Sequence, residues 1–244
     1  HCIKDEETFA REMGAAMKRA RSGGIITAGL RPTEPHTGYG YIKAETAELD
    51  RVDGLPFHAV ARFVEKPDLE TARAYLDEGG YYWNGGMFVF RVDVFLEELE
   101  RHAPDHLEGR SALASRIDDP ERWGEAFSLL PRQSIDYALM EHSDRVLVCP
   151  VTYDWNDVGS WSSVQQLLSS DPNGNTRQGE KIWQDDCHNC LAYSTLDRPL
   201  ALIGLSDVVV VQTAEGTLVC RQEDLQRVRE AQAAFLKPPS ERRG

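Results

Sequence analysis

The segment Phe63-Val64-Glu65-Lys66-Pro67 joins a predicted strand over 58–64 to a predicted helix, Leu69–Glu78. Pro67 suits the start of that helix, because its fixed φ is helical and its missing N–H would have no partner there. The strand therefore ends in an acid and a base, which places two opposite charges at the edge of a sheet. Because α/β proteins bind ligands at such edges, the segment predicts an α/β fold with a ligand site at Glu65 and Lys66.

Strand and helix patterns alternate along the first part of the chain, as is typical of an α/β sheet. The apolar run 24–30 predicts a strand that is covered on both faces. A polar excursion is expected over 43–57, and an aromatic loop over 81–86 leads into a strand that ends at 90. Further strands are predicted at 58–64 and 145–151. Helices are predicted at 5–21, 94–101 with Asp93 as its N-cap, 105–117, 120–129 and 134–142, and another is expected to follow Trp161 and to end at Leu168.

Short β patterns follow residue 171, at 190–193, 200–203, 207–213 and 217–220. A last helix is predicted over 223–236, and Lys237-Pro238-Pro239 ends it. This change in character predicts two domains, 1–170 and 171–244, of which the second is small and β-rich and carries the terminal helix.

Composition excludes several classes of function. Lys and Arg number 27 against 40 Asp and Glu, and the net charge of −13 would repel the backbone of a nucleic acid. The five cysteines are odd in number and scattered, which fits a reducing compartment better than a disulfide framework. No apolar run approaches the roughly 18 residues of a membrane span. We therefore expect a cytoplasmic protein that binds neither nucleic acid nor a membrane.

Glu65 and Lys66 are the first candidate site residues. Adjacent side chains on a strand point to opposite faces, so each is expected to have its own partner rather than to pair with the other. Lys66 suits a phosphate as a point charge, and Glu65 can accept hydrogen bonds from sugar hydroxyls. For an isolated Glu-Lys-Pro segment, however, a solvated charge pair is the commoner interpretation.

Tyr39, Gly40 and Asn84 are further candidates for ligand contact. Glycines on both sides of Tyr39 indicate that backbone, rather than a side chain, approaches another group closely. A β-bulge without a ligand is an equally good interpretation of that pattern. The amide of Asn84 both donates and accepts, which suits a polyhydroxylated ligand, whereas its alternative role is to stabilise a local turn.

Two carboxylates, Asp154 and Asp157, follow the strand predicted over 145–151. Mg²⁺ is usually held by one or two carboxylates together with substrate phosphates, so both residues are candidate ligands. Capping of the next helix is the competing role, for which Ser160 is better placed. Cys187-His188-Asn189-Cys190 has the form of half a zinc site without a second pair, and a β-turn is the better interpretation.

Several of these segments occur together in one known family. They are Pro35-His36-Thr37-Gly38-Tyr39-Gly40-Tyr41-Ile42, Phe63-Val64-Glu65-Lys66-Pro67, Trp83-Asn84-Gly85-Gly86-Met87-Phe88, Ser134-Ile135-Asp136-Tyr137-Ala138-Leu139-Met140-Glu141 and Trp155-Asn156-Asp157-Val158-Gly159-Ser160-Trp161. In type and order they resemble the mannose-1-phosphate guanylyltransferase family. Each motif alone is a weak signal, whereas the ordered set spans most of the chain.

The resemblance implies the nucleotide-diphospho-sugar transferase fold, a Rossmann-like (GT-A-like) mixed sheet with a small β-rich C-terminal part. It implies that GTP and mannose 1-phosphate give GDP-mannose and pyrophosphate, with Mg²⁺ and a lysine offsetting the charge. By this resemblance Lys66 is catalytic and holds the sugar phosphate, and Asp157 is a catalytic ligand of the metal. Glu65, Asn84 and the Tyr39-Gly40 backbone then hold the mannose.

The chain also departs from the family pattern. The glycine-rich Gly-Thr-Arg-Leu-Trp-Pro signature, which cradles the nucleotide phosphates, does not occur in it. We therefore expect the printed chain to lack the N-terminal nucleotide-binding segment and to be unable to turn over by itself. Smaller departures are Gly85 where serine is common, His142 where lysine is common and Glu215 where aspartate is common.

Two other functions stay open at this point. A nucleotidylyltransferase for glucose 1-phosphate or another hexose 1-phosphate would share these motifs. A sugar-nucleotide-binding regulatory protein without catalysis would lack the nucleotide loop. These residues do not set the base, the pathway or the oligomeric state, and a homo-oligomer is one of the assemblies that they allow.

Overall fold

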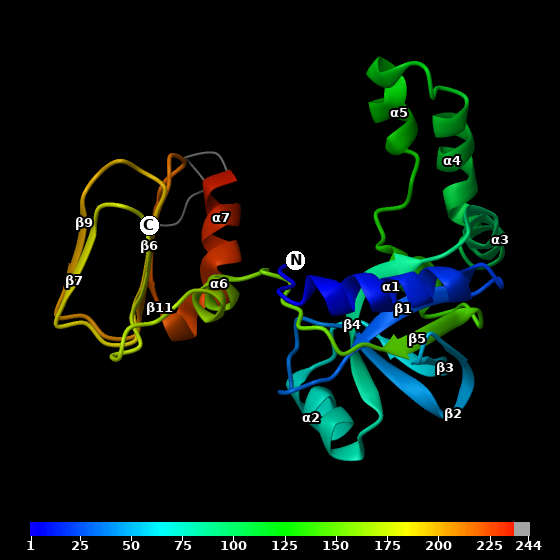
Figure 1. Cartoon of the computed structure of the whole chain (residues 1–244). Helices are drawn as coiled ribbons and strands as arrows, with labels where there is room; N and C mark the ends of the chain where they lie inside the picture. Colours follow the sequence, from blue (N-terminus) through cyan, green and yellow to red (C-terminus); the bar gives the residue numbers. More distant parts are fainter. Residues whose placement is uncertain (237–244) are drawn as a thin grey trace. The chain divides into compact units, whose positions relative to one another are not determined.

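The computed structural model describes residues 1–236, and the helix end predicted at Lys237-Pro238-Pro239 lies outside them (Figure 1). The chain forms two compact units, Ile3–Trp155 and a second that contains His1–Cys2 and the chain from Asn156 onward. The sequence places the domain boundary between residues 170 and 171, whereas the compact units divide after Trp155. The difference arises because Trp161 and Leu168 pack against the strands of the second unit.

The sheet of the first unit is mixed, as the sequence predicts. Its strands are β1 Ile25–Leu30, β2 Tyr41–Val52, β3 Leu55–Val64, β4 Tyr81–Val89 and β5 Val146–Pro150. They follow the order β1-β4-β2-β3-β5, and β5 also pairs with β1, so the sheet closes into a barrel. The β1–β5 pair is parallel, and the other pairs are antiparallel.

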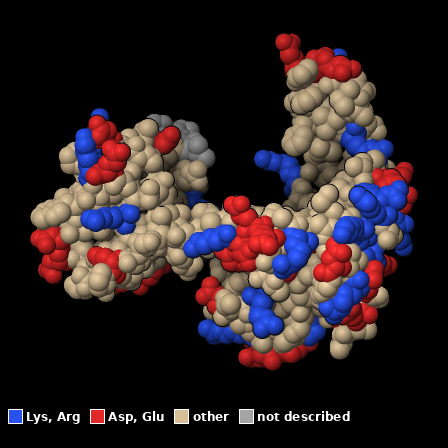
Figure 2. Space-filling view, in the orientation of Figure 1, with Lys and Arg blue, Asp and Glu red and all other residues tan. Residues whose placement is uncertain are grey.

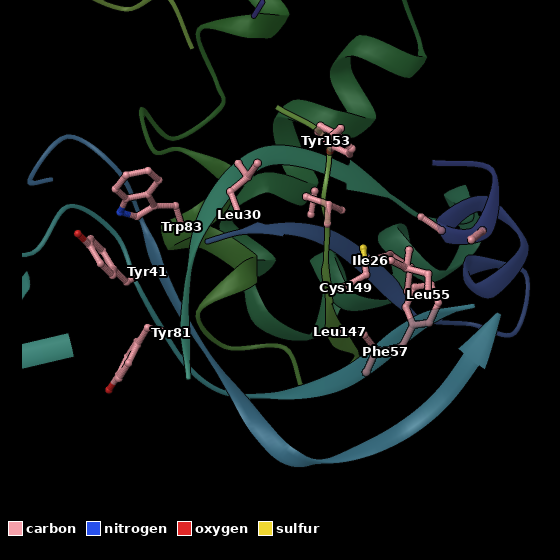
Figure 3. Packing of buried hydrophobic residues seen from close by; sticks show 14 of the residues in the cluster. Ile26, Leu30, Tyr41, Leu55, Phe57, Tyr81, Trp83, Leu147, Cys149 and Tyr153 are labelled. Carbon is pink, nitrogen blue, oxygen red and sulfur yellow. The ribbon is translucent and has the colours of Figure 1, made fainter. Parts of the chain in front are cut away.

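Strand β1 is buried along its whole length, which confirms the prediction of a strand covered on both faces. On one face Ile26 and Leu30 join the larger apolar cluster (Figure 3). Ala16 of helix α1, Glu6–Ala20, belongs to the same cluster. On the other face Ile25 packs with Leu139. Burial of one such aliphatic side chain contributes about 1.5–3 kcal/mol, so the two clusters supply most of the drive to fold this unit.

Strands β2 and β3 form a long hairpin, and the polar excursion expected over 43–57 is wrong. The turn is Asp53-Gly54, with φ values of 51° and 86°. Two residues with positive φ give the tight turn that matches the twist of a hairpin, and Asp-Gly is a preferred pair for it. The outer half of β2 is exposed and polar, which explains why composition hid the strand. The aromatic loop expected over 81–86 is likewise part of a strand, β4.

The helices of the first unit are α1 Glu6–Ala20, α2 Leu69–Glu78, α3 Val92–His102, α4 Leu107–Ala114 and α5 Trp123–Phe127. Short 3₁₀ turns, Pro104–His106 and Pro120–Arg122, lead into α4 and α5, so the helices predicted at 105–117 and 120–129 are shorter than expected. In Figure 1, α4 and α5 project as an arm from the sheet of this unit. The predicted cap of α3 is wrong, because Arg91 is the N-cap and Asp93 lies inside the first turn.

The segment predicted as an α-helix over 134–142 contains a π-helix, Asp136–Met140. Its widened turn is closed by the N–H of Glu141, which donates to the carbonyl oxygen of Asp136 at 3.0 Å. Such turns are rare and often occur at functional sites.

Charged side chains of both signs are interspersed on the face of the first unit that Figure 2 shows. Repulsion within the excess of acidic residues is therefore partly offset by lysines and arginines among them. Within residues 1–236, no helix has the length and apolar character needed to cross a membrane.

The second unit is built mainly from parallel strands. They are β6 Thr176–Gln178, β7 Ile182–Asp185, β8 Leu191–Ser194, β9 Leu200–Ile203, β10 Val208–Gln212 and the antiparallel β11 Thr217–Arg221. Strands β6, β8 and β10 lie in the sheet β11-β10-β8-β6, and β7 pairs with β9. The last four strands lie where the sequence predicts them, whereas β6 and β7 were not predicted because they are short and half polar.

Two α-helices accompany these strands, α6 Trp161–Leu167 and α7 Val228–Leu236. A 3₁₀ helix, Gln222–Arg227, precedes α7, so the last predicted helix is divided. The Cys187-His188-Asn189-Cys190 segment connects β7 to β8, and both cysteines are buried in an apolar cluster with Leu202. Asn189 there has a φ of 52°, so this segment is the turn that the sequence favours over a zinc site.

Candidate active site

Strand β3 ends at Val64, and the chain bends at Glu65 and Lys66 before α2 begins. Lys66 has a φ of 49°, a left-handed conformation that side chains other than glycine rarely adopt. Strain of this kind tends to concentrate at functional sites. The bend therefore lies at the residue that the sequence marks as the phosphate ligand.

Glu65 and Lys66 form an ion pair, which corrects the prediction that they point apart. That prediction assumed a strand, whereas the strand has ended and the left-handed backbone turns the Lys66 ammonium back onto the Glu65 carboxylate. The Glu65 side chain is only 9% exposed and the Lys66 side chain is 55% exposed. The hydrogen bond to Glu65 raises the pKa of Lys66 above its usual range, so the lysine stays positively charged.

Gly40 lies against both of the side chains that the sequence assigns to a sugar. A Cβ at Gly40 would overlap a carboxylate oxygen of Glu65 and would lie 3.2 Å from the Cβ of Asn84. The Gly40 carbonyl also accepts the backbone N–H of Asn84 at 2.8 Å. The close approach to backbone predicted here is thus present, and the groups that approach are Glu65 and Asn84.

Tyr39 belongs to an aromatic cluster beside this glycine. Its ring stacks on His36 with centroids 3.9 Å apart, and it meets the edges of Trp83 and Trp155 at 5.1 and 5.4 Å. The N–H of Gly38 donates to Nδ1 of His36 at 3.1 Å, so the ring proton of the neutral imidazole lies on Nε2. The cluster holds the segment before β2 in place, and His36 is a member that the sequence did not reveal.

Asn84 is buried in β4, and its amide has a fixed orientation. The Oδ1 atom accepts the hydroxyl of Thr27 at 3.0 Å and the N–H of Gly86 at 3.1 Å. The Nδ2 atom donates to a carboxylate oxygen of Asp136 at 3.0 Å. The register between β1 and β4 shifts beside Asn84, which places a β-bulge at this position.

The π-helix and the residue after it supply contacts that sequence reasoning missed. Asp136 holds the amide of Asn84, and Glu141 accepts the backbone N–H of Glu65 at 3.2 Å. The hydroxyl of Tyr137 lies 3.5 Å from the carbonyl oxygen of Glu65. The motif that carries these residues was visible in the sequence, but nothing in it showed which side chains face β3 and β4.

Asp157 belongs to the second unit, in the loop that leads into α6. Val158, which follows it, has a φ of 51°, although a β-branched residue strongly disfavours this conformation. The N–H of Val158 donates to the side chain of Asn156 at 2.8 Å. A Cβ at Gly159 would lie 2.5 Å from a carboxylate oxygen of Asp157, so glycine leaves the room that this carboxylate occupies.

The two competing cap assignments are resolved by the structure. Ser160 is the N-cap of α6, and its hydroxyl accepts the N–H of Ser163 at 3.2 Å. Asp154 lies in the first unit, where its carboxylate accepts the backbone N–H groups of Lys4 and Asp5 at 2.9 and 2.8 Å. Asp154 therefore anchors the start of α1, and Asp157 is left as the candidate metal ligand.

No group of three or more His, Cys, Asp or Glu side chains that could hold a metal occurs in the described part of the chain. A metal at Asp157 would accordingly take most of its ligands from a bound substrate or from water. Oxygen ligands of this kind suit Mg²⁺, which commonly binds through one or two carboxylates and phosphate oxygens.

The family of the chain follows from comparison with known proteins. A family model described as "Nucleotidyl transferase" matches residues 1–173. The chain belongs to the nucleotidyl transferase family. A second model, "MannoseP isomerase/GMP-like beta-helix domain", matches residues 184–231 of the second unit. These matches confirm the family resemblance and the fold class that the ordered motifs predict.

Curated relatives match nearly the whole chain. It is 42% identical over 239 residues to the xanthan biosynthesis protein XanB of Xanthomonas campestris pv. campestris (strain B100), a match that covers 94% of this chain and 48% of the relative. It is 41% identical over 234 residues to a mannose-1-phosphate guanylyltransferase of Salmonella montevideo. That match covers 94% of this chain and 49% of the relative. The chain of this family member thus spans about half the length of the curated relatives it matches.

Solved structures share the fold. The crystal structure of mannose-1-phosphate geranyltransferase from Thermus thermophilus matches with a TM-score of 0.81 and 32% identity, over 97% of this chain and 67% of that one. Mannose-6-phosphate isomerase from Helicobacter pylori matches with a TM-score of 0.53 and 31% identity, over 64% of this chain and 60% of that one. A β-rich part after the mixed sheet is therefore shared with a solved nucleotide-sugar family fold.

Proposed function

We propose that this nucleotidyl transferase chain supplies the sugar-phosphate site of an enzyme that makes GDP-mannose and pyrophosphate from GTP and mannose 1-phosphate. The names of its relatives support this proposal. The single observation that carries it is the cluster at Gly40, where the carboxylate of Glu65 and the amide of Asn84 both face the glycine and the ammonium of Lys66 pairs with Glu65. The ammonium of Lys66 can bind a phosphate through a charge-assisted hydrogen bond. The carboxylate of Glu65 can accept hydrogen bonds from sugar hydroxyls, and the amide of Asn84 can donate to them.

In the proposed reaction an oxygen of mannose 1-phosphate attacks the α-phosphorus of GTP. The bond between the α-phosphorus and the bridging oxygen breaks, and pyrophosphate leaves. Two anions must approach for this to happen, so a fixed cation at the sugar phosphate stabilises the transition state. Lys66 can supply that charge, because the hydrogen bond to Glu65 raises the pKa of its ammonium group and its side chain is more than half exposed.

Binding of the sugar phosphate would exchange the partner of Lys66. In the free protein its ammonium is paired with Glu65. A phosphate that takes the ammonium leaves a buried carboxylate without its cation, and sugar hydroxyls can then donate to that carboxylate. Binding of the phosphate is therefore expected to favour binding of the sugar. The phosphate takes the ammonium of Lys66 from Glu65, and the sugar hydroxyls replace that ammonium as the partner of the Glu65 carboxylate.

Asp157 would hold Mg²⁺ in this proposal, together with oxygens of the substrate phosphates. The strained Val158 and the side-chain-free Gly159 support this role, because they give the Asp157 carboxylate its place in the loop. When bound, the ion would act as a Lewis acid on a phosphoryl oxygen. We further propose a cytoplasmic location, which is supported by the five cysteines, all of which carry free thiols.

The proposal is tested on the full-length protein with GTP, Mg²⁺ and mannose 1-phosphate, by following the release of pyrophosphate and the formation of GDP-mannose. Glucose 1-phosphate in place of mannose 1-phosphate, and ATP in place of GTP, serve as controls for the sugar and the base. We expect GDP-mannose to form fastest. Faster turnover of another hexose 1-phosphate would replace mannose in the proposal, and binding without any turnover would favour a regulatory protein.

A further inference from the structure

The π-helix and the residue that follows it direct two carboxylates, Asp136 and Glu141, toward the candidate sugar site, and the family resemblance assigns a role to neither. Asp136 and Glu141 are five positions apart, and in an α-helix of 3.6 residues per turn such residues point in different directions. The i to i+5 bond between their backbones widens the turn and brings them onto the same side. Asp136 then holds Asn84, and Glu141 holds the backbone of Glu65.

The contact with Asp136 leaves the side-chain amide of Asn84 with one N–H group that is free to donate to a ligand. Its Oδ1 already accepts from Thr27 and Gly86, and one of its two Nδ2 hydrogens is given to Asp136. An amide has two donors and one acceptor oxygen, so Asn84 can offer a ligand a single N–H. Without an acceptor at Asp136, the amide would lose the partner that fixes its nitrogen end.

The carboxylate of Glu65 offers a hydrogen-bond acceptor beside the same glycine, Gly40. Its carboxylate oxygen and the Nδ2 atom of Asn84 both lie within 4 Å of the point where a Cβ of Gly40 would be. A hydroxyl group can donate to Glu65 and accept from Asn84 at once. A carbonyl oxygen cannot donate to Glu65, and an ammonium group cannot accept from Asn84.

We propose that Asp136 is a positioning residue that makes this site selective for a sugar hydroxyl, by fixing Asn84 as a hydrogen-bond donor beside the acceptor Glu65. This inference rests on the proposed function and adds the recognition of one hydroxyl to it. Asp136 acts through Asn84 and does not itself contact the sugar.

The experiment measures binding of mannose 1-phosphate and of each monodeoxy mannose 1-phosphate to the full-length protein by calorimetry. Asp136→Ala is expected to weaken the binding of mannose 1-phosphate about ten-fold, because it leaves the nitrogen of the Asn84 amide without its hydrogen-bond acceptor. Asp136→Asn keeps an acceptor oxygen and should restore most of the affinity. For one deoxy analogue, the one without the recognised hydroxyl, Asp136→Ala should cause no further loss.

Two further measurements separate positioning from a general effect on folding. Added to Asn84→Ala, the Asp136→Ala substitution should cost nothing more, and the KM for GTP should stay unchanged. Asp144→Ala is the matched control, since Asp144 is exposed and its carboxylate bonds to no described residue. An equal loss for every sugar analogue, or a loss that Asp136→Asn does not restore, would overturn the inference.

A measurement on the unaltered protein covers the case in which Asp136→Ala fails to fold. With labelled asparagine, one side-chain amide proton of Asn84 should exchange slowly without ligand, and the other should become protected when mannose 1-phosphate binds. No change in the second proton on binding would contradict the inference. An unaltered protein that does not bind mannose 1-phosphate at all would instead overturn the proposed function, and this inference with it.

Discussion

Lys66 and Val158 are both residues other than glycine with a left-handed backbone, at φ values of 49° and 51°. Each lies in a segment that the sequence marks as functional, the first beside Glu65 and the second beside Asp157. At Lys66 the strained residue itself carries the side chain that we propose binds the sugar phosphate. At Val158 the strained residue follows Asp157, whose carboxylate we propose binds the metal.

The two segments also differ in what holds them. The bend before Lys66 is fixed from a distance, because the N–H of Glu65 donates to Glu141, 76 positions later in the chain. The loop at Val158 is held by a bond to Asn156 only 2 positions earlier and by the Ser160 cap, and the backbone of Asn156 also pairs with that of Cys2 at 2.8 and 3.0 Å. The bend before Lys66 thus depends on a contact between distant segments, whereas the loop at Val158 combines contacts to its neighbours with one distant pairing, to Cys2.

Lys66→Met is expected to have the largest effect, because it removes the only charge assigned to the sugar phosphate. The loss in transition-state stabilisation should be on the order of 2–4 kcal/mol, or about 30- to 1,000-fold in kcat/KM. Steady-state kinetics of the full-length protein measure it. Lys43→Met is the control: Lys43 bonds to Glu78 and to the carbonyl of Gly79, so that variant should lose stability and keep its kcat/KM. An unchanged kcat/KM in Lys66→Met would remove Lys66 from the site.

Asp157→Asn is expected to come next. A carbonyl oxygen in place of a carboxylate oxygen weakens a Mg²⁺ ligand, so the Mg²⁺ concentration for half-maximal rate should rise by about 10- to 100-fold. Titration of the initial rate with Mg²⁺ measures this change. Asp154→Asn is the matched control, because that carboxylate holds the backbone at the start of α1 and should affect the melting temperature alone. Equal Mg²⁺ dependence in the two variants would show that Asp157 is not the ligand.

Gly40→Ala tests the packing of the first segment. The new methyl group would press on the carboxylate of Glu65 and on Asn84, and such overpacking costs about 1–3 kcal/mol. We expect mannose 1-phosphate to bind about ten-fold more weakly, as measured by calorimetry. Gly14→Ala in α1 meets no atom within 4 Å and should stabilise the protein by about 0.5–1 kcal/mol. Unchanged binding in Gly40→Ala would show that Glu65 and Asn84 do not act from this position.

Val158→Gly should have the smallest effect and sharpens the comparison most directly. Relief of the left-handed strain gains about 1–2 kcal/mol, and the extra chain freedom of glycine costs about 0.5–1 kcal/mol. The net result should be a gain in unfolding free energy of between zero and about 1.5 kcal/mol, measured by urea denaturation. Lys66→Gly should lose activity and should gain less stability than Val158→Gly, because the buried carboxylate of Glu65 loses its cation. A large loss of stability in Val158→Gly would mean that the side chain of Val158, rather than its backbone, holds the loop.

The same contrast explains what the sequence could predict. Local features could be predicted from the sequence. The start of α2 after Pro67, the Ser160 cap of α6 and the doubly buried β1 all follow from neighbouring residues. The Asp53-Gly54 turn was equally local, but the exposed polar half of β2 concealed the hairpin around it. Predictions failed where a residue type has two common uses, as with Asp93, which lies inside α3 and does not cap it.

Contacts between distant segments were beyond the sequence. Asp136 meets Asn84 across 52 positions, and no spacing rule links them. The pairing of Glu65 with Lys66 was mispredicted for a related reason, since the end of β3 and the left-handed Lys66 depend on the fold around them. The motifs named the candidate residues as a group, and the three-dimensional structure shows which of these side chains contact one another.

The way in which the first sheet closes has a consequence for how the protein forms. Strand β5 pairs with β1 on one side and with β3 on the other, and Ile25 finds its partner Val146 only after most of the first unit has been synthesised. Contacts between such distant positions form slowly, because a long loop must be ordered before the pairing compensates for it. Until then β1 and β3 each present an open edge to other chains. A nascent or truncated chain that stops short of Val146 would therefore be the most aggregation-prone form of this protein.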